Sequence, residues 1–405
     1  MKQLIIALLL TNLFASNLVA QPEYEIISLG QIGEENSGGQ AVSPSGQFVT
    51  GFSDQLSFLW SGDTGVLSLQ PLPTRPFNIP NGVNDAGVIA GTGATTFFGS
   101  SALPAIWSID SVALLPLPSG ETIGRANDIN NADLVVGSVD GGSAEQAATF
   151  TPGGTGAVLT QTLNGGTLRT AFGVNDAGRI VGQALDPNNA AVIKGFYLDD
   201  GDAEATDIGA LVSIGHNSAI AFAVSESGLI TGSSSLNAGV NSRAFLWSDY
   251  AGMEEVPLPA ATSSASGRGV NDDGWIVGTA GGATAIPFLF DGETTYRLQD
   301  IIVAGGNGWD LVSGTSNGAF GIANDGTIVG RGLLNGNLTA FVMLRMEDDL
   351  LLGDVNCDGE VNLLDVAAFI DAFFGPVFEP KADINQDNVV DLLDITPFVL
   401  LLSGG

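Results

Sequence analysis

Two segments near the C-terminus carry side-chain oxygens at a spacing that suits a metal ion. They span residues 354–365 and 383–394, and in both of them Asp or Asn occupies positions 1, 3, 5, 9 and 12. Calcium takes about six to eight hard oxygen ligands, and this spacing, with a backbone carbonyl at position 7, wraps them around one ion. The sequence therefore predicts two Ca²⁺ ions. The predicted ligands are Asp354, Asn356, Asp358, Glu360, Asn362, Asp365, Asp383, Asn385, Asp387, Val389, Asp391 and Asp394.

Position 6 of each loop needs a residue that tolerates a sharp turn. Gly359 fills it in the first loop, and Asn388 fills it in the second; these are the two residue types that adopt positive φ most readily. An acidic surface loop is the alternative interpretation, and the duplication argues against it. Because the carboxylates of a metal-free loop repel one another, we expect the segment to fold poorly until calcium binds.

An apolar stretch with helical spacing follows each loop, which predicts two short helices packed into a small core. The expected core positions are Leu363, Val366, Ile370, Phe373, Leu392, Ile395, Val399 and Leu402. Pro397 removes a backbone hydrogen bond from the second helix, so we expect that helix to start late or to kink.

This duplicated loop and helix, with Asp at position 12 and no entering helix, resembles a type I dockerin. The resemblance implies that residues 353–405 fasten the chain, in a calcium-dependent way, to a cohesin-like or envelope protein. The calcium residues match the dockerin pattern position by position. At positions 10 and 11, where dockerins often carry a hydroxyl residue, this chain has Leu363-Leu364 and Leu392-Leu393.

The rest of the chain is built from a repeat. A segment resembling G-V-N-D-x-G-x-I-V-G occurs seven times, and each copy ends on a glycine. The separations between these glycines run from 40 residues (Gly51 to Gly91) to 52 (Gly278 to Gly330), within the range of propeller blades. The predicted fold is all-β: a seven-bladed β-propeller over residues 21–345. A linker at 346–352 joins it to a small α-helical, duplicated calcium-loop module at 353–405.

Each unit resolves into four short strands. The Asn-Asp-x-Gly step between the first two strands is turn chemistry, so we interpret the recurring Asn-Asp pairs as structural rather than catalytic. An aromatic residue in the third strand fits as a wedge between adjacent blades. These third strands are 58–60, 105–107, 148–150, 195–197, 244–247, 288–290 and 340–342. The last unit lacks a fourth strand, and residues 24–30 supply the missing copy, so we expect the N-terminal strand to close the ring.

The repeats resemble the HAF-type repeats of bacterial extracellular proteins, which are named after a His-Ala-Phe strand. That strand reads Arg243-Ala244-Phe245 and Thr339-Ala340-Phe341 in this chain. The resemblance covers about residues 24–345. It implies a secreted propeller and implies no particular reaction.

Charge and the N-terminus restrict location and partners. Asp plus Glu number 44 against 12 Lys plus Arg, a net charge of −32, which gives no means of holding phosphate backbones and argues against nucleic acid. Residues 1–20 read as a signal peptide, with Lys2, a short apolar run and a small residue before cleavage near Ala20. That run is too short to span a bilayer. We therefore expect a secreted or cell-surface protein without a membrane span.

No catalytic signature is present in the sequence, so we predict no catalytic or cofactor-binding residue. His216, the one histidine, is interpreted as a loop or surface residue. The acidic run 199–202 is interpreted as a solvated turn rather than a further cation site. Phe97-Phe98 fits either a stacking platform for a ligand or a half-buried loop anchor.

Three functions fit these observations. The leading hypothesis is a non-catalytic binding or structural propeller, attached to an extracellular assembly or envelope through its calcium module, with a carbohydrate or protein ligand on the propeller face. The alternative is a carbohydrate-active enzyme, a polysaccharide hydrolase or lyase, carried by the docking module. In the third, the calcium module only caps and stabilises the propeller, and deletion of residues 350–405 would lower its stability.

Overall fold

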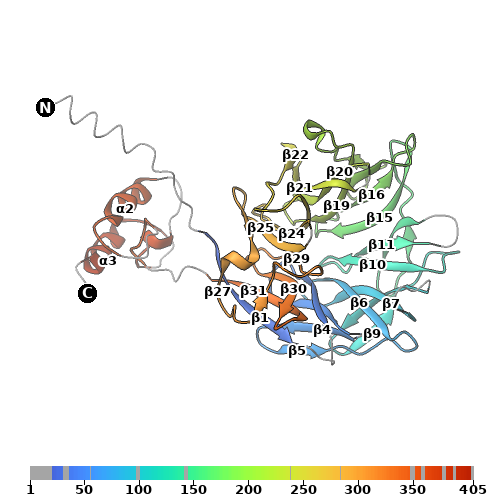
Figure 1. Ribbon diagram of the computed structural model, residues 1–405, viewed down its shortest axis with the longest axis horizontal. Helices are drawn as coiled ribbons and strands as arrows, with labels where there is room; N and C mark the ends of the chain where they lie inside the picture. Colours follow the sequence, from blue (N-terminus) through green and yellow to red (C-terminus); the bar gives the residue numbers. More distant parts are fainter. Residues whose placement is uncertain are drawn as a thin grey trace. The chain divides into compact units, whose positions relative to one another are not determined.

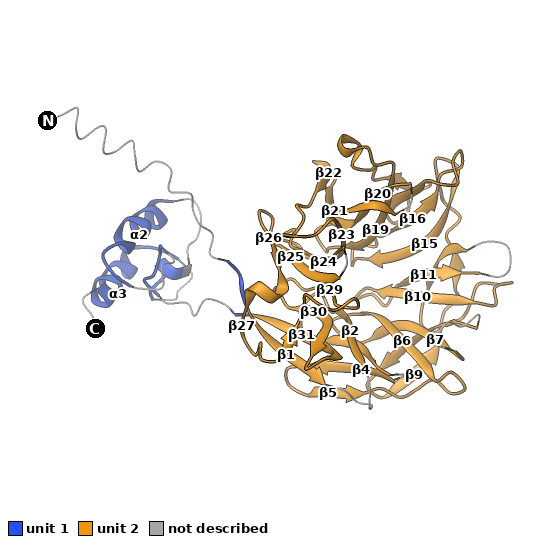
Figure 2. Cartoon of the chain, viewed as in Figure 1, with its two compact units in different colours: residues 1–23, 346–405 blue, residues 24–345 orange. Residues whose placement is uncertain are grey.

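The computed structural model describes residues 21–30, 36–54, 56–96, 101–140, 145–237, 239–282, 284–346, 352–356, 361–375, 380–385 and 389–402. The chain divides into two compact units, one of residues 24–345 and one of residues 346–405 with 1–23 (Figure 2). The predicted signal segment 1–20 and the pair Phe97-Phe98 lie outside the described residues. Within the described residues, no helix has the length and apolar character needed to cross a membrane.

Seven β-sheets form the larger unit, as predicted (Figure 1), and their strands pair antiparallel except for β1 with β27. The first blade contains β2 (Ser37–Val42), β3 (Val49–Ser53), β4 (Leu56–Ser61) and β5 (Gly65–Ser68). The second contains β6 (Phe77–Val83), β7 (Ile89–Ala94), β8 (Leu103–Ser108) and β9 (Ser111–Leu114). The third contains β10 (Gly124–Ile129), β11 (Val135–Val139), β12 (Gln146–Phe150) and β13 (Ala157–Val158). The fourth blade contains β15 (Gly166–Val174), β16 (Ile180–Leu185), β17 (Ile193–Leu198) and β18 (Thr206–Asp207), and the short β14 (Thr162–Leu163) pairs with β15. The fifth contains β19 (Ser218–Val224), β20 (Ile230–Leu236), β21 (Val240–Ser248) and β22 (Gly252–Glu255). The sixth contains β23 (Ser264–Val270), β24 (Ile276–Gly281), β25 (Ala285–Phe290) and β26 (Thr295–Arg297).

The seventh blade closes the ring with the N-terminal strand, which confirms the prediction. Its strands are β29 (Gly318–Ile322), β30 (Ile328–Leu334), β31 (Asn337–Met346) and β1 (Glu23–Gly30), with the short β27 (Ile302–Ala304) and β28 (Trp309–Asp310) at its edges. Buried Tyr24 on β1 donates its hydroxyl to the carbonyl of Gly326, at 3.1 Å. The first strand of each blade contacts the first strand of the next, and β29 contacts β2, so seven inner strands surround one central channel.

The third-strand aromatics are wedges between blades, as predicted. Each lies in a separate buried cluster that also contains residues of the preceding blade; Phe196, for example, packs with Val136, and Phe341 packs with Leu289. The wedge also explains the closing glycine of the repeat. A Cβ on Gly330 would come within 2.5 Å of the Phe341 ring and 2.2 Å of a backbone oxygen, so no side chain fits there.

In four blades the Asn that begins this turn is structural, as predicted, and it also joins neighbouring blades. The Oδ1 atom of Asn130 accepts the backbone N–H groups of Ala132 and Leu134 at 3.0 and 2.9 Å, which closes its own turn. Its Nδ2 donates to the carbonyl of Asn175 in the next blade, at 3.0 Å. Asn84, Asn175 and Asn271 make equivalent inter-blade bonds.

The residue after that Asn completes a second ring of bonds around the channel mouth. Its side chain accepts the backbone N–H of the equivalent turn in the preceding blade. The N–H of Asp85 donates to Asn131 at 2.8 Å, that of Asn131 donates to Asp176 at 2.7 Å, and that of Asp176 donates to Glu226 at 2.8 Å. The bonds from Ser227 to Asp272, from Asp272 to Asn324 and from Ser45 to Asp85 continue it. The N–H of Asn324 closes the ring on the carbonyl of Pro44, at 2.9 Å. These side chains therefore hold the blades together.

The C-terminal unit contains α2 (Asp365–Phe374), the short η3 (Pro380–Ala382) and α3 (Leu392–Leu402). Its core is centred on Phe369 and Phe398, whose rings stack at 4.1 Å and 6°. Helix α3 runs through Pro397 without interruption.

Of the eight predicted core positions of this unit, three pack against the core and five do not. Leu363, Ile370, Leu392, Ile395 and Val399 are exposed, whereas Val366, Phe373 and Leu402 are partly buried. The position-12 aspartate fixes the rotation of each helix, because it must face its own loop. Residues four positions later lie on the same helix face, which places Phe369 and Phe398 in the core.

Candidate calcium-binding module

The position-12 carboxylates organise both loops in the same way. In the first loop, Asp365 accepts the N–H of Asn356 with Oδ1 at 3.0 Å and the N–H of Asn362 with Oδ2 at 2.8 Å. In the second loop, Asp394 accepts the N–H groups of Asn385 and Asp391 at the same two distances. Both carboxylates are fully buried. Each loop is therefore folded around its aspartate, whose remaining lone pairs are available to a cation.

The position-1 carboxylates are buried as well. Asp354 and Asp383 are 3% and 4% exposed. The Nζ atom of Lys381 lies 3.5 Å from Oδ2 of Asp354, and both side chains are buried. Lys381 is the one basic residue of the sequence after Arg345, so a single ammonium group accompanies four buried carboxylates in this unit.

Such an imbalance of buried charge fits a cation-binding module. A buried carboxylate without an opposite charge costs several kcal/mol, and the donors here are the carboxylate and amide oxygens that hard cations prefer. The residues present therefore fit calcium. The contact of Lys381 with Asp354 was not predicted from the sequence. The indication available in the sequence was that Lys381 is the only basic residue of an acidic segment.

The structure places the other predicted ligands less completely. At position 9, Oδ1 of Asn362 and of Asp391 accepts the N–H two residues later, at 2.8 and 2.7 Å, just before α2 and at the start of α3. Asp358, Glu360 and Asp387 lie outside the described residues, as do Gly359 and Asn388. Across the ranges that the structure describes, no group of three or more His, Cys, Asp or Glu side chains gathers at one point.

The one histidine lies in a loop, as predicted, between residues 212–214 and β19, but it is buried rather than at the surface. His216 is 6% exposed, and its Nδ1 lies 3.2 Å from Oγ of Ser234. The Ser234 hydroxyl donates to the carbonyl of Ser218 and accepts the N–H of Leu211, so its proton is not directed at the ring. Burial, assisted by the charge of Arg243, lowers the pKa of His216. The pair is a buried packing contact between polar groups rather than a base beside a nucleophile.

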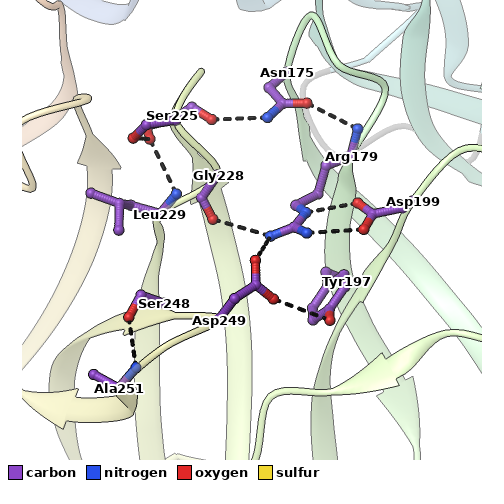
Figure 3. Close-up of polar contacts among 11 residues, drawn as sticks. Asn175, Arg179, Tyr197, Asp199, Ser225, Gly228, Leu229, Ser248, Asp249 and Ala251 are labelled. Atoms are coloured by element: carbon purple, nitrogen blue, oxygen red, sulfur yellow. Dashed lines mark hydrogen bonds and ion pairs between the residues drawn. The ribbon is translucent and has the colours of Figure 1, made fainter.

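The acidic run 199–202 belongs to an ion-pair network that links the fourth and fifth blades (Figure 3). Both oxygens of Asp199 accept hydrogen bonds from Arg179, at 2.7 and 2.9 Å. Arg179 also bonds Asp249 at 2.9 Å and lies over the ring of Tyr197 at 4.3 Å. The turn is therefore not simply solvated, because an arginine neutralises its first carboxylate.

The fold and the loops define a β-propeller protein that carries a duplicated acidic-loop module. Residues 352–397 match the family described as the Dockerin type I domain. No curated protein matches the chain.

Two solved structures are similar to the chain. Virginiamycin B lyase from Staphylococcus aureus is 9% identical, with a TM-score of 0.48, and the match covers 80% of this chain and 100% of that one. The β-propeller domain of the trilobed protease from Pyrococcus furiosus is 10% identical, with a TM-score of 0.47 and coverage of 78% and 99%.

Proposed function

We propose that the chain is an exported, non-catalytic binding protein that a calcium-loaded C-terminal module attaches to a cohesin-like or envelope protein outside the cell. The observation that carries this proposal is the dockerin type I match over residues 352–397, which falls on two loops of identical bonding. The recurring acids of the propeller support a non-catalytic role, because their carboxylates accept backbone N–H groups of neighbouring blades.

Each loop holds one Ca²⁺ ion through the six residues predicted for it. The ion supplies positive charge to the buried carboxylates, and the chain does the rest. Asp365 and Asp394 join their loop to the following helix, and the position-9 side chains accept backbone N–H groups where the loop ends. Calcium binding and folding of the module are therefore coupled.

The docking surface is built on the two pairs of leucines at loop positions 10 and 11. Leu363, Leu364, Leu392 and Leu393 are 64–79% exposed. Exposed apolar residues of this size in a contiguous group mark interaction sites, and the duplication gives each half of the module the same pair. Leucine in place of the hydroxyl residues found in many dockerins indicates a partner with an apolar receiving surface.

The test is capture by the full-length chain, immobilised through its N-terminal side, from the envelope and culture fluid of the producing cell. We expect one partner in the presence of calcium and none with a chelator, and mass spectrometry under native conditions should show two bound Ca²⁺ ions. The variant Asp365→Ala should bind one ion, because it removes the residue around which the first loop folds.

A matched variant separates docking from calcium binding. Replacement of all four exposed leucines by serine should leave two bound ions and abolish capture, since none of the four side chains supplies a predicted ligand. Capture that is equal with calcium and with chelator would contradict the proposal. So would two bound ions in the Asp365→Ala variant.

A further inference from the structure

Every inner strand of the propeller carries a β-bulge at the same place. The strand register shifts by one residue there, in all seven blades. A bulge redirects the side chain of its extra residue, and all seven extra residues line one cavity of about 160 Å³ in the central channel. We call these residues the bulge ring: Gln40, Asn81, Asn127, Phe172, Phe222, Arg268 and Phe320.

The bulge ring is chemically divided although the repeats are alike. Three consecutive blades contribute the amides Gln40, Asn81 and Asn127, and the other four contribute three phenylalanines and one arginine. The turn and the wedge of each repeat are similar because every blade needs them. No packing requirement of the repeat explains why this position separates into an amide half and an aromatic half.

Arg268 lies in the aromatic half without a counter-charge. Its guanidinium carbon is 4.2 Å from the centroid of the Phe222 ring, which in turn is 5.2 Å from the ring of Phe172. Among the described residues, Arg268 makes neither an ion pair nor a hydrogen bond, whereas Arg179, Arg243 and others pair with acids. Part of the side chain is open to water in the channel, yet burial still lowers the pKa of Arg268. Its five N–H donors are available to a ligand.

The amide half is held in place with acceptors left over. Nδ2 of Asn81 donates to the carbonyl of Ala126, and Nδ2 of Asn127 donates to the carbonyl of Ala171, both at 2.8 Å. These bonds to the next blade fix the two side chains, and within the described residues their Oδ1 atoms accept no hydrogen bond. Gln40 has no partner for its amide within the described part of the chain.

Two carboxylates also line the cavity, and both are engaged. Asp128 accepts the N–H groups of Ile129 and Val174, at 2.9 and 3.0 Å, and Glu226 accepts the N–H of Asp176 at 2.8 Å. The net charge of −32 repels anions at long range, but physiological salt screens charges beyond about 8 Å. Arg268 is therefore the charged group that a ligand meets with its donors unpaired.

We propose that the bulge ring binds an acidic sugar, a pyranose that bears a carboxylate, either free or at the end of a glycan chain. The carboxylate pairs with the fork of Arg268. The apolar face of the sugar ring lies against Phe222 and its aromatic neighbours, and hydroxyl groups donate to Asn81, Asn127 and Gln40. A cavity of this size admits one six-membered ring, since about 150 Å³ holds benzene. The inference deepens the proposed binding role of the propeller and is independent of calcium-dependent docking.

Calorimetric titration of the full-length chain tests the inference with matched sugars. Galacturonate, glucuronate and mannuronate are each compared with galactose, glucose and mannose, which differ by the carboxylate alone. At least one uronate should bind about 10- to 100-fold more tightly than its neutral partner, the range expected for charge-assisted hydrogen bonds. The corresponding trimer distinguishes a chain end, which binds more tightly than the monomer, from a free sugar, which does not. If no uronate binds more tightly than its neutral partner, the inference is wrong, even where calcium-dependent capture succeeds.

Two arginine variants identify the site. Arg268→Gln should remove the preference for the uronate while the melting temperature stays the same or rises, because an unpaired, desolvated charge has been removed. Arg125→Gln is the control, since Arg125 is exposed on inner strand β10 and does not line the cavity. It should bind as the unmodified chain does. A full preference in Arg268→Gln would overturn the assignment.

Discussion

At the scale of single residues, Asp128 differs from its equivalents in every other blade. The position after the bulge is glycine or alanine in the other six repeats, where inner strands approach each other closely: Ala41, Gly82, Gly173, Ala223, Gly269 and Gly321. Burial raises the pKa of Asp128 to about 7, although hydrogen bonds from Val174 and Ile129 oppose the rise. The folded chain therefore holds a proton at this site that the unfolded chain loses near pH 4.

This difference predicts a pH dependence with a definite sign. Between about pH 4 and pH 7 the folded state binds more protons at Asp128 than the unfolded state, so its contribution to stability falls as the pH rises. The Asp128→Asn variant lacks this pH-dependent contribution to stability, because asparagine does not titrate. Relative to the unmodified chain, it should gain roughly 1–4 kcal/mol of unfolding free energy between pH 4.5 and pH 8, measured by denaturant titration.

Asp85→Asn provides the matched control. Burial alone would raise the pKa of Asp85, but hydrogen bonds from Ser45 and Asn131 outweigh it and hold that pKa below its ordinary value. Its contribution therefore changes only below about pH 4, and its difference from the unmodified chain should be constant across the same range. A difference in unfolding free energy that rises with pH for Asp85→Asn, or that stays constant for Asp128→Asn, would contradict this prediction.

The loop aspartates could be predicted from the sequence, whereas other features of the sites could not. Asp354 and Asp365 follow a fixed spacing within one short segment, so their common role is local information. The contact of Lys381 with Asp354 joins two loops, and no spacing rule connects them. The bulges were missed for another reason: inserting Asn127 into a strand changes neither its composition nor its turn residues. Arg268 and Phe222 are 46 residues apart in the sequence and meet only where the fifth and sixth blades pack against each other.

At the scale of elements, strand β1 determines whether the ring is closed. It pairs with β31 on one side and with β27 on the other. The side chain of Tyr24 belongs to the buried cluster shared by the sixth and seventh blades. The prediction that residues 24–30 complete the last blade rested on counting strands per repeat, and such counts survive sequence drift because each blade needs four strands to cover its neighbours.

Tyr24→Ala should therefore destabilise the whole propeller. The change removes a fully buried ring and its hydrogen bond to Gly326, and large-to-small substitutions of aromatic residues cost about 3–5 kcal/mol. Glu25→Ala, at the exposed neighbouring position, should cost less than about 0.5 kcal/mol. Thermal unfolding of both variants checks the contrast. If both variants lost the same unfolding free energy, β1 would be a peripheral strand rather than the closure of the ring.

The helices show the opposite case, in which the local pattern was misleading. Leu363 and Leu392 have the right spacing for a core stripe, but they are exposed because Asp365 and Asp394 determine which helix face is inside. Hydrophobic periodicity fixes the existence of a helix more firmly than its rotation, especially when nearly every position is apolar. Knowledge of the loop geometry would have corrected the assignment.

At the scale of the whole molecule, the chain has two hydrophobic cores of different origin. The propeller core consists of seven clusters between blades, and the C-terminal unit has one small cluster around Phe369 and Phe398. A ligand that binds only the folded state stabilises the unit that holds it. Calcium should therefore act on the C-terminal unit and leave the propeller unaffected.

Differential scanning calorimetry of the full chain should show two transitions. The smaller should rise with calcium, by an amount equivalent to roughly 3–4 kcal/mol at about a hundred- to a thousandfold excess over the dissociation constant. The larger should stay at the same temperature with calcium, with chelator, or after deletion of residues 350–405. A larger transition that falls on deletion would favour the calcium module as a cap on the propeller.

The position of β31 has a mechanical consequence for an anchored protein. In the sequence this strand precedes the dockerin-like module, and it lies between β30 and β1 rather than at the edge of its sheet. When the module is held by its partner and the propeller is pulled, for example by flow, the tension enters along a strand with hydrogen bonds on both flanks. The load is shared by two neighbouring strands, β30 and β1. Strand β1, which completes the ring, therefore also resists the extraction of β31, the strand through which the propeller would be pulled.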